Sequence, residues 1–394
     1  MADESGTAVI LAAGEGRRLE PLTNRRPKPM VPVANRPLLE HVIEAVAAAG
    51  IDRIVLVVGY KQERIRNHFR DGDDWGVTIE YVEQSTQLGT GHAVLQAESA
   101  VDGPFVVLNG DRIVDAEAVS AVRDRLRDGD APLVTVTAVE SPRDYGVARI
   151  DGDRVTEIDE KPEGAVDTNR INAGVYGFSP AIFDAIRSTN TPGELAITAT
   201  LNELAERGAV TGVSYDGRWL DVSNLWDVLT VNAALIHDSD HARDAPAAGR
   251  RVGERVTIAD DVVLAGNVRV GPNATLSGAT AIASNVTVAA NAVVENSVVL
   301  PDAVIGPGAV VRDAVVAGNA RIGPNATVVG GASTVVVGDA VHRDVTLGGV
   351  VGDNATIGGG ATLTDGAVVG DDVRADAGVV IDGRVESGAV VRRG

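Results

Sequence analysis

Cysteine is absent from the 394 residues, which excludes disulfides, cysteine-ligated zinc sites and a cysteine nucleophile. Aromatic residues make up only 3 % of the chain and hydrophobic residues 44 %, so the core must consist of Val, Ala, Ile and Leu. No apolar run reaches membrane-spanning length, and residues 1–8 lack the charged start and long apolar core of a signal peptide. These absences lead us to expect a soluble, cytoplasmic protein with no membrane partner.

Positive charge is also scarce, since 35 basic residues face 55 acidic ones and the formal net charge is −20. This balance argues against a nucleic-acid partner, because such proteins normally carry a basic surface. Only three lysines occur, Lys28, Lys61 and Lys161. Few lysines and high acidity together favour a halophilic protein, whose charged surface is screened by dense salt. The remaining lysines are candidates for roles that arginine cannot fill.

The composition changes abruptly along the chain, whose length is sufficient for two or three domains. All twelve aromatic residues lie at or before Trp226, and everything downstream is rich in Val, Ala, Gly, Asp and Asn. Residues 238–251 are polar, contain proline and glycine, and have the composition of a linker. We therefore predict a first domain over residues 1–237, a linker over 238–251 and a second domain over 252–394.

Apolar residues recur at every sixth position of the second domain, nine times without a break from Val252 to Leu300. The phase then slips by one residue, resumes at Ile305 and Ile322, and continues in a later block from Ile357. A period of six fits a parallel β-helix, in which each inward residue stacks on its equivalent one coil away. Nine matches argue against the alternative of a disordered tail, and a narrow interior explains the lack of aromatics.

Strands and helices alternate in the first domain, which predicts an α/β fold with a Rossmann-like, mixed but mainly parallel sheet. Ligands of such sheets bind beyond the carboxyl ends of the strands. The predicted strands are residues 9–11, 54–59, 77–83, 105–108 and 133–139, and the predicted helices are residues 38–49, 91–100 and 117–127.

A glycine loop follows the first predicted strand in the sequence LAAGEGRRL, residues 11–19, with PKP at residues 27–29. A dinucleotide-binding fingerprint would require glycine where Leu19 stands, and a phosphate-binding P-loop would require Gly-Lys-Ser/Thr, so both patterns fail. The loop amides and a nearby arginine are nevertheless suited to phosphate. A Gly-x-Gly alone would be simply a turn. Together with Lys28, whose position two prolines restrict, the pattern favours a phosphate site.

These residues resemble the signature of sugar-1-phosphate nucleotidylyltransferases, commonly LAAGxGTRL followed by PKP. The departure is Arg17, where threonine is usual. Six further segments follow in the order of the family: QLGTGHA at residues 87–93 preceded by Gln84, GD at 110–111, YGV at 145–147, EKP at 160–162, NAG at 172–174 and WLDV at 219–222. The resemblance spans roughly residues 7–235, and the family commonly carries a left-handed β-helix after this region.

The resemblance implies a reaction in which a sugar 1-phosphate attacks the α-phosphorus of UTP or dTTP and pyrophosphate leaves, with Mg²⁺ as cofactor. Glucose 1-phosphate and N-acetylglucosamine 1-phosphate are both open as substrates. The implied catalytic residues are Arg18 and Lys28; the nucleotide would bind at Leu11, Ala13, Gly14, Gly16, Gln84, Gly89 and Thr90, the sugar phosphate at Gly146, Glu160, Lys161 and Asn172, and the metal at Asp111 and Asp221.

Simpler interpretations stand beside these roles. Asp111 is also typical of a turn at a strand end, and Glu160 with Lys161 also fits a surface ion pair. We interpret His92 as a helix-start residue and Lys61 as a surface residue. Both lie outside the predicted site.

Two alternative functions concern the whole chain. A bifunctional enzyme would also acetylate glucosamine 1-phosphate in its β-helix, but this tail has no Tyr or Lys, and its one plausible coil histidine is His342. A non-catalytic regulatory homologue would usually have lost the arginine, lysine or carboxylates that this chain retains. Without chemistry of its own, the β-helix would be a scaffold for a homo-oligomer, possibly a trimer.

Overall fold

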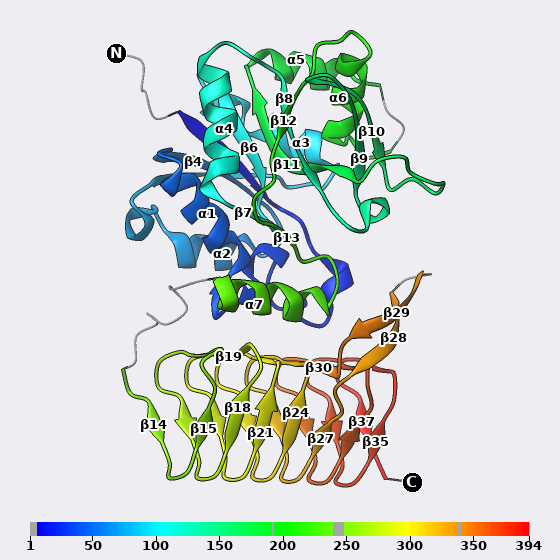
Figure 1. Ribbon diagram of the computed structural model, residues 1–394. Helices are drawn as coiled ribbons and strands as arrows, with labels where there is room; N and C mark the ends of the chain where they lie inside the picture. Colours follow the sequence, from blue (N-terminus) through cyan, green and yellow to red (C-terminus); the bar gives the residue numbers. More distant parts are fainter. Residues whose placement is uncertain (1–5, 191–192, 239–247, 338–339, 394) are drawn as a thin grey trace. The chain divides into compact units, whose positions relative to one another are not determined.

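Figure 1 shows the computed structural model, which describes residues 6–190, 193–238, 248–337 and 340–393. Packing divides the chain into two units. The first contains the chain up to Glu15, together with Pro27–Met30 and Leu38–Asp221, and the second contains Gly16–Arg26, Val31–Pro37 and the chain from Val222 onward. Most of the expected linker, residues 239–247, lies outside the described residues. The expected domain limits stay a prediction.

The first unit is built on a mixed nine-stranded sheet in the order β5-β4-β1-β6-β11-β8-β12-β10-β9. Its first four strands are parallel, and β11 runs antiparallel between β6 and β8. The strands are β1 (Thr7–Ala12), β4 (Arg53–Val58), β5 (Thr78–Glu83), β6 (Phe105–Asn109), β8 (Leu133–Ala138), β9 (Gly146–Asp151), β10 (Arg154–Glu160), β11 (Arg170–Phe178) and β12 (Thr211–Ser214), and a separate pair joins β7 (Arg112–Val114) to β13 (Trp219–Asp221).

Helices cover both faces of this sheet (Figure 1). Alternation along β1 explains why, since Ala8 and Ile10 belong to one apolar core and Val9 to the other. The first core also takes residues of α1 (Leu38–Ala48), α2 (Gln62–Phe69) and α4 (Ala116–Arg127), and the second takes residues of α3 (Thr90–Gln96), α5 (Ala181–Ser188) and α6 (Ile197–Ala205). The α/β prediction is confirmed, and the predicted strands and helices occur within a few residues of their expected limits.

The second unit contains the predicted β-helix, in which short strands stack into three parallel sheets (Figure 1). Coils repeat every 18 residues at first, so that Val252 pairs with Val270 and Ile258 with Leu276. The apolar core of the coils consists of Val, Ala, Ile and Leu, in agreement with the missing aromatics.

The three sheets take successive strands of each coil. The first is β14 (Arg251–Val252), β17 (Arg269–Val270), β20 (Thr287–Val288), β23 (Val304–Ile305), β26 (Arg321–Ile322), β31 (Thr356–Ile357), β34 (Arg374–Ala375) and β37 (Val390–Val391). The second is β15 (Thr257–Ile258), β18 (Thr275–Ser277), β21 (Val293–Glu295), β24 (Val310–Arg312), β27 (Thr327–Val328), β32 (Thr362–Leu363) and β35 (Val380–Ile381). The third is β16 (Val262–Leu264), β19 (Thr280–Ile282), β22 (Val298–Val299), β25 (Ala314–Val316), β30 (Gly349–Val351), β33 (Ala367–Val369) and β36 (Arg384–Val385).

The register differs from the predicted repeat at one point. Ile282 pairs with Val299, so Val299 and not Leu300 occupies the ninth inward position. The reason is a corner one residue shorter between β21 and β22, which reduces the coil to 17 residues. The phase slip therefore precedes Leu300 instead of following it.

An antiparallel hairpin interrupts the coils between β27 and β30, formed by β28 (Ala332–Val337) and β29 (Ala340–Thr346). It accounts for the gap between the two blocks of the repeat. His342 lies on this hairpin and not on a coil, and its ring lies 4.8 Å from that of Trp226. Its expected position on a coil was wrong, because the hairpin inserts where the repeat is broken.

Smaller elements complete the two units. In the second unit β2 (Pro32–Val33) pairs with β3 (Arg36–Pro37), and α7 (Asp227–Asp238) contacts β2 and the coils β19, β22 and β25. The remaining 3-10 turns include η1 (Arg17–Leu19) and η2 (Lys28–Met30). Searching the described part of the chain finds no helix long and apolar enough to span a bilayer.

Candidate functional site

A cavity of about 500 Å³ opens in the first unit beyond the carboxyl ends of β1 and β6. Its size is in the usual range for small-molecule sites. It is lined by residues from six of the predicted segments: Leu11, Ala13, Gly14, Lys28, Gln84, Gly89, Thr90, Asp111, Glu160 and Asn172. Segments separated by up to 161 residues in the chain thus meet in one place.

A lysine between two carboxylates is the main charged feature of the site. The Lys28 ammonium lies 2.6 Å from an oxygen of Asp111 and 3.9 Å from an oxygen of Asp221, and its side chain is only 14 % exposed. Asp111 follows β6 and Asp221 ends β13, and η2 carries Lys28. Two carboxylates on one cation form a donor set that suits a hard divalent metal as well as an ammonium.

Arg112 adds a second positive charge that sequence reasoning missed. It faces Asp221 across the β7–β13 pair, donates a hydrogen bond of 3.1 Å to the Asn172 carbonyl, and lies over the Trp219 ring at 5.6 Å. Burial pushes the pKa of Asp111 upward, but Lys28 and Arg112 outweigh it and hold this pKa below its ordinary value. The carboxylate is therefore ionised at neutral pH.

The proposed nucleotide-binding residues form one wall. The buried Gln84 amide donates to the Gly89 carbonyl at 3.3 Å and contacts His92 Nδ1 at 2.9 Å. Gly89 has a φ of 105°, and a Cβ there would lie 2.5 Å from the Leu195 carbonyl oxygen, so only glycine fits. Thr90 is the first residue of α3, and its hydroxyl accepts a hydrogen bond of 2.9 Å from the Ile197 amide.

The proposed sugar-phosphate residues lie on the antiparallel part of the sheet. Gly146 and Glu160 are paired on β9 and β10, and a Cβ on Gly146 would lie 2.9 Å from the Glu160 carboxylate. Asn172 is buried on β11, where it donates to the Tyr176 hydroxyl at 2.8 Å and accepts the Gly174 amide at 3.1 Å. Lys161 is exposed, does not line the cavity, and holds a left-handed φ of 49°.

Gly16 and Arg18 belong to the second unit. Arg18 is exposed on η1, which begins after Gly16 in a left-handed conformation with φ of 74°. The cavity-lining part of the first motif ends at Gly14.

Several lining residues carry no sequence signal of a site. Tyr176 lies on a buried strand, and Glu194 and Thr198 flank the start of α6, a region without a motif. Gln87, which donates to the Ala13 carbonyl at 2.6 Å, lies inside a recognised segment and could have been found there. Arg112 directly follows Asp111 and could have been found in the same way.

Comparison with known proteins agrees with the resemblance found in the motifs. The family described as "Nucleotidyl transferase" matches residues 7–238, more than half of the chain, and the "GMPPB C-terminal domain" matches residues 258–347. A solved structure, described as a putative glucose-1-phosphate thymidylyltransferase from Bacillus anthracis in complex with a sucrose, is 27 % identical with a TM-score of 0.55, covering 60 % of this chain and 95 % of that one.

Among curated relatives, the "Bifunctional protein GlmU" of Methanococcus maripaludis is 38 % identical over 57 % of this chain and 53 % of that protein. The "Low-salt glycan biosynthesis nucleotidyltransferase Agl11" of Haloferax volcanii is 36 % identical over 66 % of this chain and 71 % of its own. The "Glucose-1-phosphate thymidylyltransferase" of Streptomyces antibioticus is 38 % identical over 59 % of this chain and 66 % of its own. The match spans about half the length of the GlmU relatives. The chain belongs to the nucleotidyl transferase family.

Proposed function

We propose that the protein transfers a nucleotidyl group from UTP or dTTP to a sugar 1-phosphate, giving a nucleoside diphosphate sugar and pyrophosphate. The observation that carries the proposal is the cavity lined by Lys28 and Asp111 beside the Gly14 loop and the Gln84–Gly89 wall, with Asp221 lying 3.9 Å from the Lys28 ammonium. Such a site combines positive charge for phosphates with a separate wall for a base. The names of several relatives point to the same chemistry.

In the proposed reaction a phosphate oxygen of the sugar 1-phosphate forms a bond to the α-phosphorus, and the bond to the β-phosphate oxygen breaks. Pyrophosphate leaves with the electron pair. The attacking phosphate is already ionised near pH 7, so no general base is required. The protein must instead hold two anions in line and neutralise the charge that builds up between them.

Each proposed residue then has a defined task. Lys28, held rigidly by η2 and its flanking prolines, would contact the nucleotide phosphates near the reacting centre. Gln84 and the backbone near Gly89 would bind the edge of the base. Glu160, Asn172 and Gly146 would fix sugar hydroxyls. The roles of Arg18 at the pyrophosphate and Lys161 at the sugar phosphate rest on their motifs.

Magnesium is the proposed cofactor, and Asp111 and Asp221 are the residues that would hold it. Their fit follows from the convergence of both carboxylates on one cation, the Lys28 ammonium. Within the described residues no group of three or more His, Cys, Asp and Glu side chains could hold a metal, so substrate phosphates would complete the site. When bound, the ion would neutralise phosphate charge.

A panel assay tests the proposal. Pyrophosphate release is measured with UTP and dTTP, each crossed with glucose 1-phosphate and N-acetylglucosamine 1-phosphate, in the presence of Mg²⁺. We expect release with at least one pair and none when the sugar phosphate is omitted. Absence of release with every pair contradicts the proposal and favours a non-catalytic homologue.

The name of the GlmU relatives suggests an alternative, a bifunctional enzyme that has an acetyltransferase activity in addition to nucleotidyl transfer. The position of His342 on the hairpin, against Trp226, does not favour it. Release of CoA from acetyl-CoA with glucosamine 1-phosphate distinguishes the two: sustained turnover would support the bifunctional enzyme.

The β-helix is proposed to form a homo-oligomer, possibly a trimer. Large apolar side chains are exposed on its outer coils, namely Val252, Val380 and Val390. Light scattering in molar KCl measures the mass of the particle and hence the number of chains in it.

A free energy of unfolding that rises between dilute buffer and molar KCl would support the proposed adaptation to salt. The cytoplasmic location stays a prediction.

A further inference from the structure

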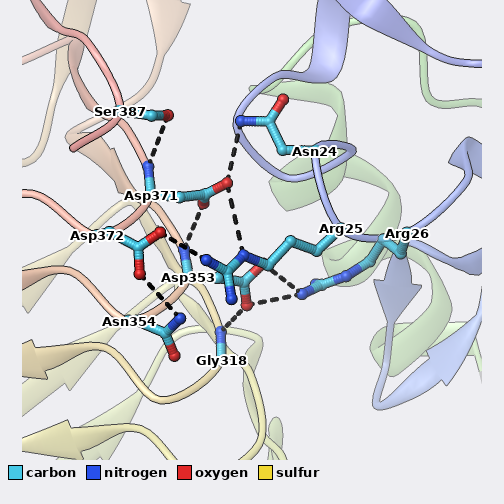
Figure 2. A network of polar contacts seen from close by, with 9 residues as sticks. All are labelled: Asn24, Arg25, Arg26, Gly318, Asp353, Asn354, Asp371, Asp372 and Ser387. Carbon is cyan, nitrogen blue, oxygen red and sulfur yellow. Dashed lines mark hydrogen bonds and ion pairs between the residues drawn. The ribbon is translucent and has the colours of Figure 1, made fainter.

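The segment Gly16–Arg26, which carries Arg18, packs on the coils inside the second unit (Figure 2). Three consecutive side chains make the contacts, and all their partners are aspartates of two neighbouring coils. Asn24 donates to Asp371 at 3.0 Å, Arg25 contacts Asp372 at 2.6 Å, and one guanidinium nitrogen of Arg26 lies 2.8 Å from both carboxylate oxygens of Asp353.

Asp353 and Asp371 occupy equivalent corners of successive coils. The strand register places each of them two residues after the last paired residue of the third sheet. In the other described coils this corner holds an uncharged residue, at Gly266, Ser284, Pro301, Gly318 and Ser387. The coil therefore does not need an aspartate there, and the two acids occur where the segment Gly16–Arg26 packs.

Asp372 is different, because the coil itself explains it. The equivalent position is Asn or Asp at six corners and glycine at Gly388, and it has a left-handed φ at each of them, which Gly, Asn and Asp tolerate better than other residues. The φ angles lie between 57° and 64° at Asn267, Asn285, Asp302, Asn319, Asn354 and Asp372. Its contact with Arg25 uses a residue that the turn requires in any case.

Backbone amides hold the two corner carboxylates in place. The Gly318 amide donates to Asp353 at 2.9 Å, the Asp353 amide donates to Asp371 at 2.7 Å, and the Ser387 hydroxyl accepts the Asp371 amide at 3.0 Å (Figure 2). A Cβ on Gly318 would lie 3.0 Å from the Asp353 carboxylate, so glycine leaves room for it. The acceptors for Arg26 and Asn24 are thus fixed by the coils.

Burial separates the two arginines. The Arg26 side chain is 11 % exposed and its partner Asp353 is 8 % exposed, whereas Arg25 and Asp372 are 41 % and 53 % exposed. Exposed pairs are screened by salt and contribute little, but a buried charge that loses its partner is strongly unfavourable. The Arg26–Asp353 pair is therefore the ion pair of the segment whose loss should cost most.

The segment is compact enough to transmit that position. Leu19 and Leu22 are fully buried, Leu19 bonds back to the Gly16 carbonyl at 2.9 Å, and the Thr23 hydroxyl donates to the same carbonyl at 2.9 Å. Arg18 lies within this folded turn. Along the chain, Gly14 precedes the segment and Lys28 follows it, and both line the cavity.

We propose that Arg26 and Asp353 are positioning residues, through which the β-helix fixes the segment that carries Arg18 and leads into Lys28. The β-helix then contributes to nucleotide binding without contacting the nucleotide. This inference rests on the proposed function, because it assigns the segment to the nucleotide phosphates. Positioning of this kind matters because small displacements of phosphate-binding groups cost much of the rate.

The test compares Arg26→Gln and Asp353→Asn with the matched control Arg25→Gln. Asn at 353 retains an acceptor for the Gly318 amide, so this variant keeps the coil corner while it removes the charge. We expect the KM for the nucleoside triphosphate to rise about tenfold in the first two variants, with the KM for the sugar phosphate within about twofold of wild type. The double variant should be no worse than either single one. Arg25→Gln should resemble wild type.

Hydrogen exchange of peptides covering residues 14–30 gives a readout that needs no activity. Exchange should be faster in Arg26→Gln and Asp353→Asn than in Arg25→Gln, under conditions where the three proteins are fully folded. Unchanged exchange in the two variants overturns the proposal. So does faster exchange if the KM for the nucleoside triphosphate is unchanged, or if the KM values for both substrates rise equally. An inactive wild type would instead refute the proposed function. The positioning role would then be decided by two measurements on the same variants, hydrogen exchange and direct binding of the nucleoside triphosphate.

Discussion

The sheet of the first unit is mixed and its cores include Phe and Tyr, whereas the coils of the second unit are parallel strands around Val, Ala, Ile and Leu. The two regions also place polar residues differently. At the sheet, chemically distinct side chains gather at strand ends in one cavity. On the coils, one turn chemistry repeats, with Asn or Asp in a left-handed conformation at corner after corner. Asp353 and Asp371 stand one residue before that position, where the other described coils hold uncharged residues. On the coils, exceptions to the repeat mark the residues that contact the segment Gly16–Arg26, whereas at the sheet motifs mark the residues of the cavity.

The largest expected effect lies in the sheet. Lys28→Gln should lower kcat by about 100- to 1,000-fold, because the lost charge acts on phosphates in the transition state. Lys61→Gln is the matched control, since Lys61 lies over the Tyr60 ring and does not line the cavity. Steady-state pyrophosphate release measures both. Equal activities of the two variants would remove Lys28 from the mechanism.

A metal-site variant comes next. Asp111→Asn should raise the Mg²⁺ concentration needed for half-maximal activity by about tenfold or more, because one of two anionic ligands becomes neutral. Mn²⁺ binding followed by paramagnetic resonance gives an independent measure. An unchanged metal requirement would leave Asp111 as a turn former at the end of β6.

The coils should show a stability effect instead. Arg26→Gln should lower the free energy of unfolding by about 3 kcal/mol, because Asp353 stays buried without its partner. Arg25→Gln should cost less than about 1 kcal/mol, as expected for a more exposed pair. Urea denaturation of the two variants measures the difference, and equal losses would contradict the distinction drawn from burial.

Gly318→Ala probes the same corner from the side of the coil. The added Cβ would lie 3.0 Å from the Asp353 carboxylate and 3.3 Å from the Pro301 carbonyl oxygen. We expect a loss of about 1 to 2 kcal/mol from such crowding, together with faster exchange in residues 14–30. Gly103→Ala is the matched control, since a Cβ at Gly103 would have no atom within 4 Å. Gly331 also has open space, but its φ of 128° would strain an alanine, so it cannot serve as the control.

The smallest effect concerns pH. Burial raises the pKa of Asp371, and the bonds from Asn24 and the Asp353 amide only partly offset it. The folded state therefore holds the proton more tightly than the unfolded state. Stability from this group is complete below the ordinary pKa of about 3.9 and is lost as the pH rises through the raised value. Urea titrations across that pH window measure the free energy of unfolding. This free energy should fall less with rising pH in Asp371→Asn than in the wild type, and an equal pH dependence in the two proteins would contradict the assignment.

The sequence predicted much of this architecture because two periodic signals dominate it. The six-residue period determined the β-helix, and the shortened corner before Val299 is the point at which the observed register differs from the predicted one. In the first unit, buried strands such as Arg53–Val58 were visible as apolar runs. The antiparallel strand β11 escaped prediction, because its pairing between β6 and β8 depends on contacts distant in sequence.

The site was predictable only as far as motifs reach. Segments from Leu11 to Asn172 were found because each carries its own local pattern, although their meeting in one cavity is a property of the fold. Glu194 has no such pattern and was missed, and Arg112 was missed although it directly follows the recognised segment that ends at Asp111. The contact of Arg26 with Asp353 joins residues 327 positions apart, and neither residue stands in a motif that would suggest the pairing.

Pyrophosphate release by the wild-type protein and Lys28→Gln, with and without sugar 1-phosphate, tests the central claim most directly. We expect Mg²⁺-dependent release by the wild type only when a nucleoside triphosphate and a sugar 1-phosphate are both present, and we expect the variant to lose it. Release that does not require the sugar phosphate, or that survives in Lys28→Gln, would contradict the central claim.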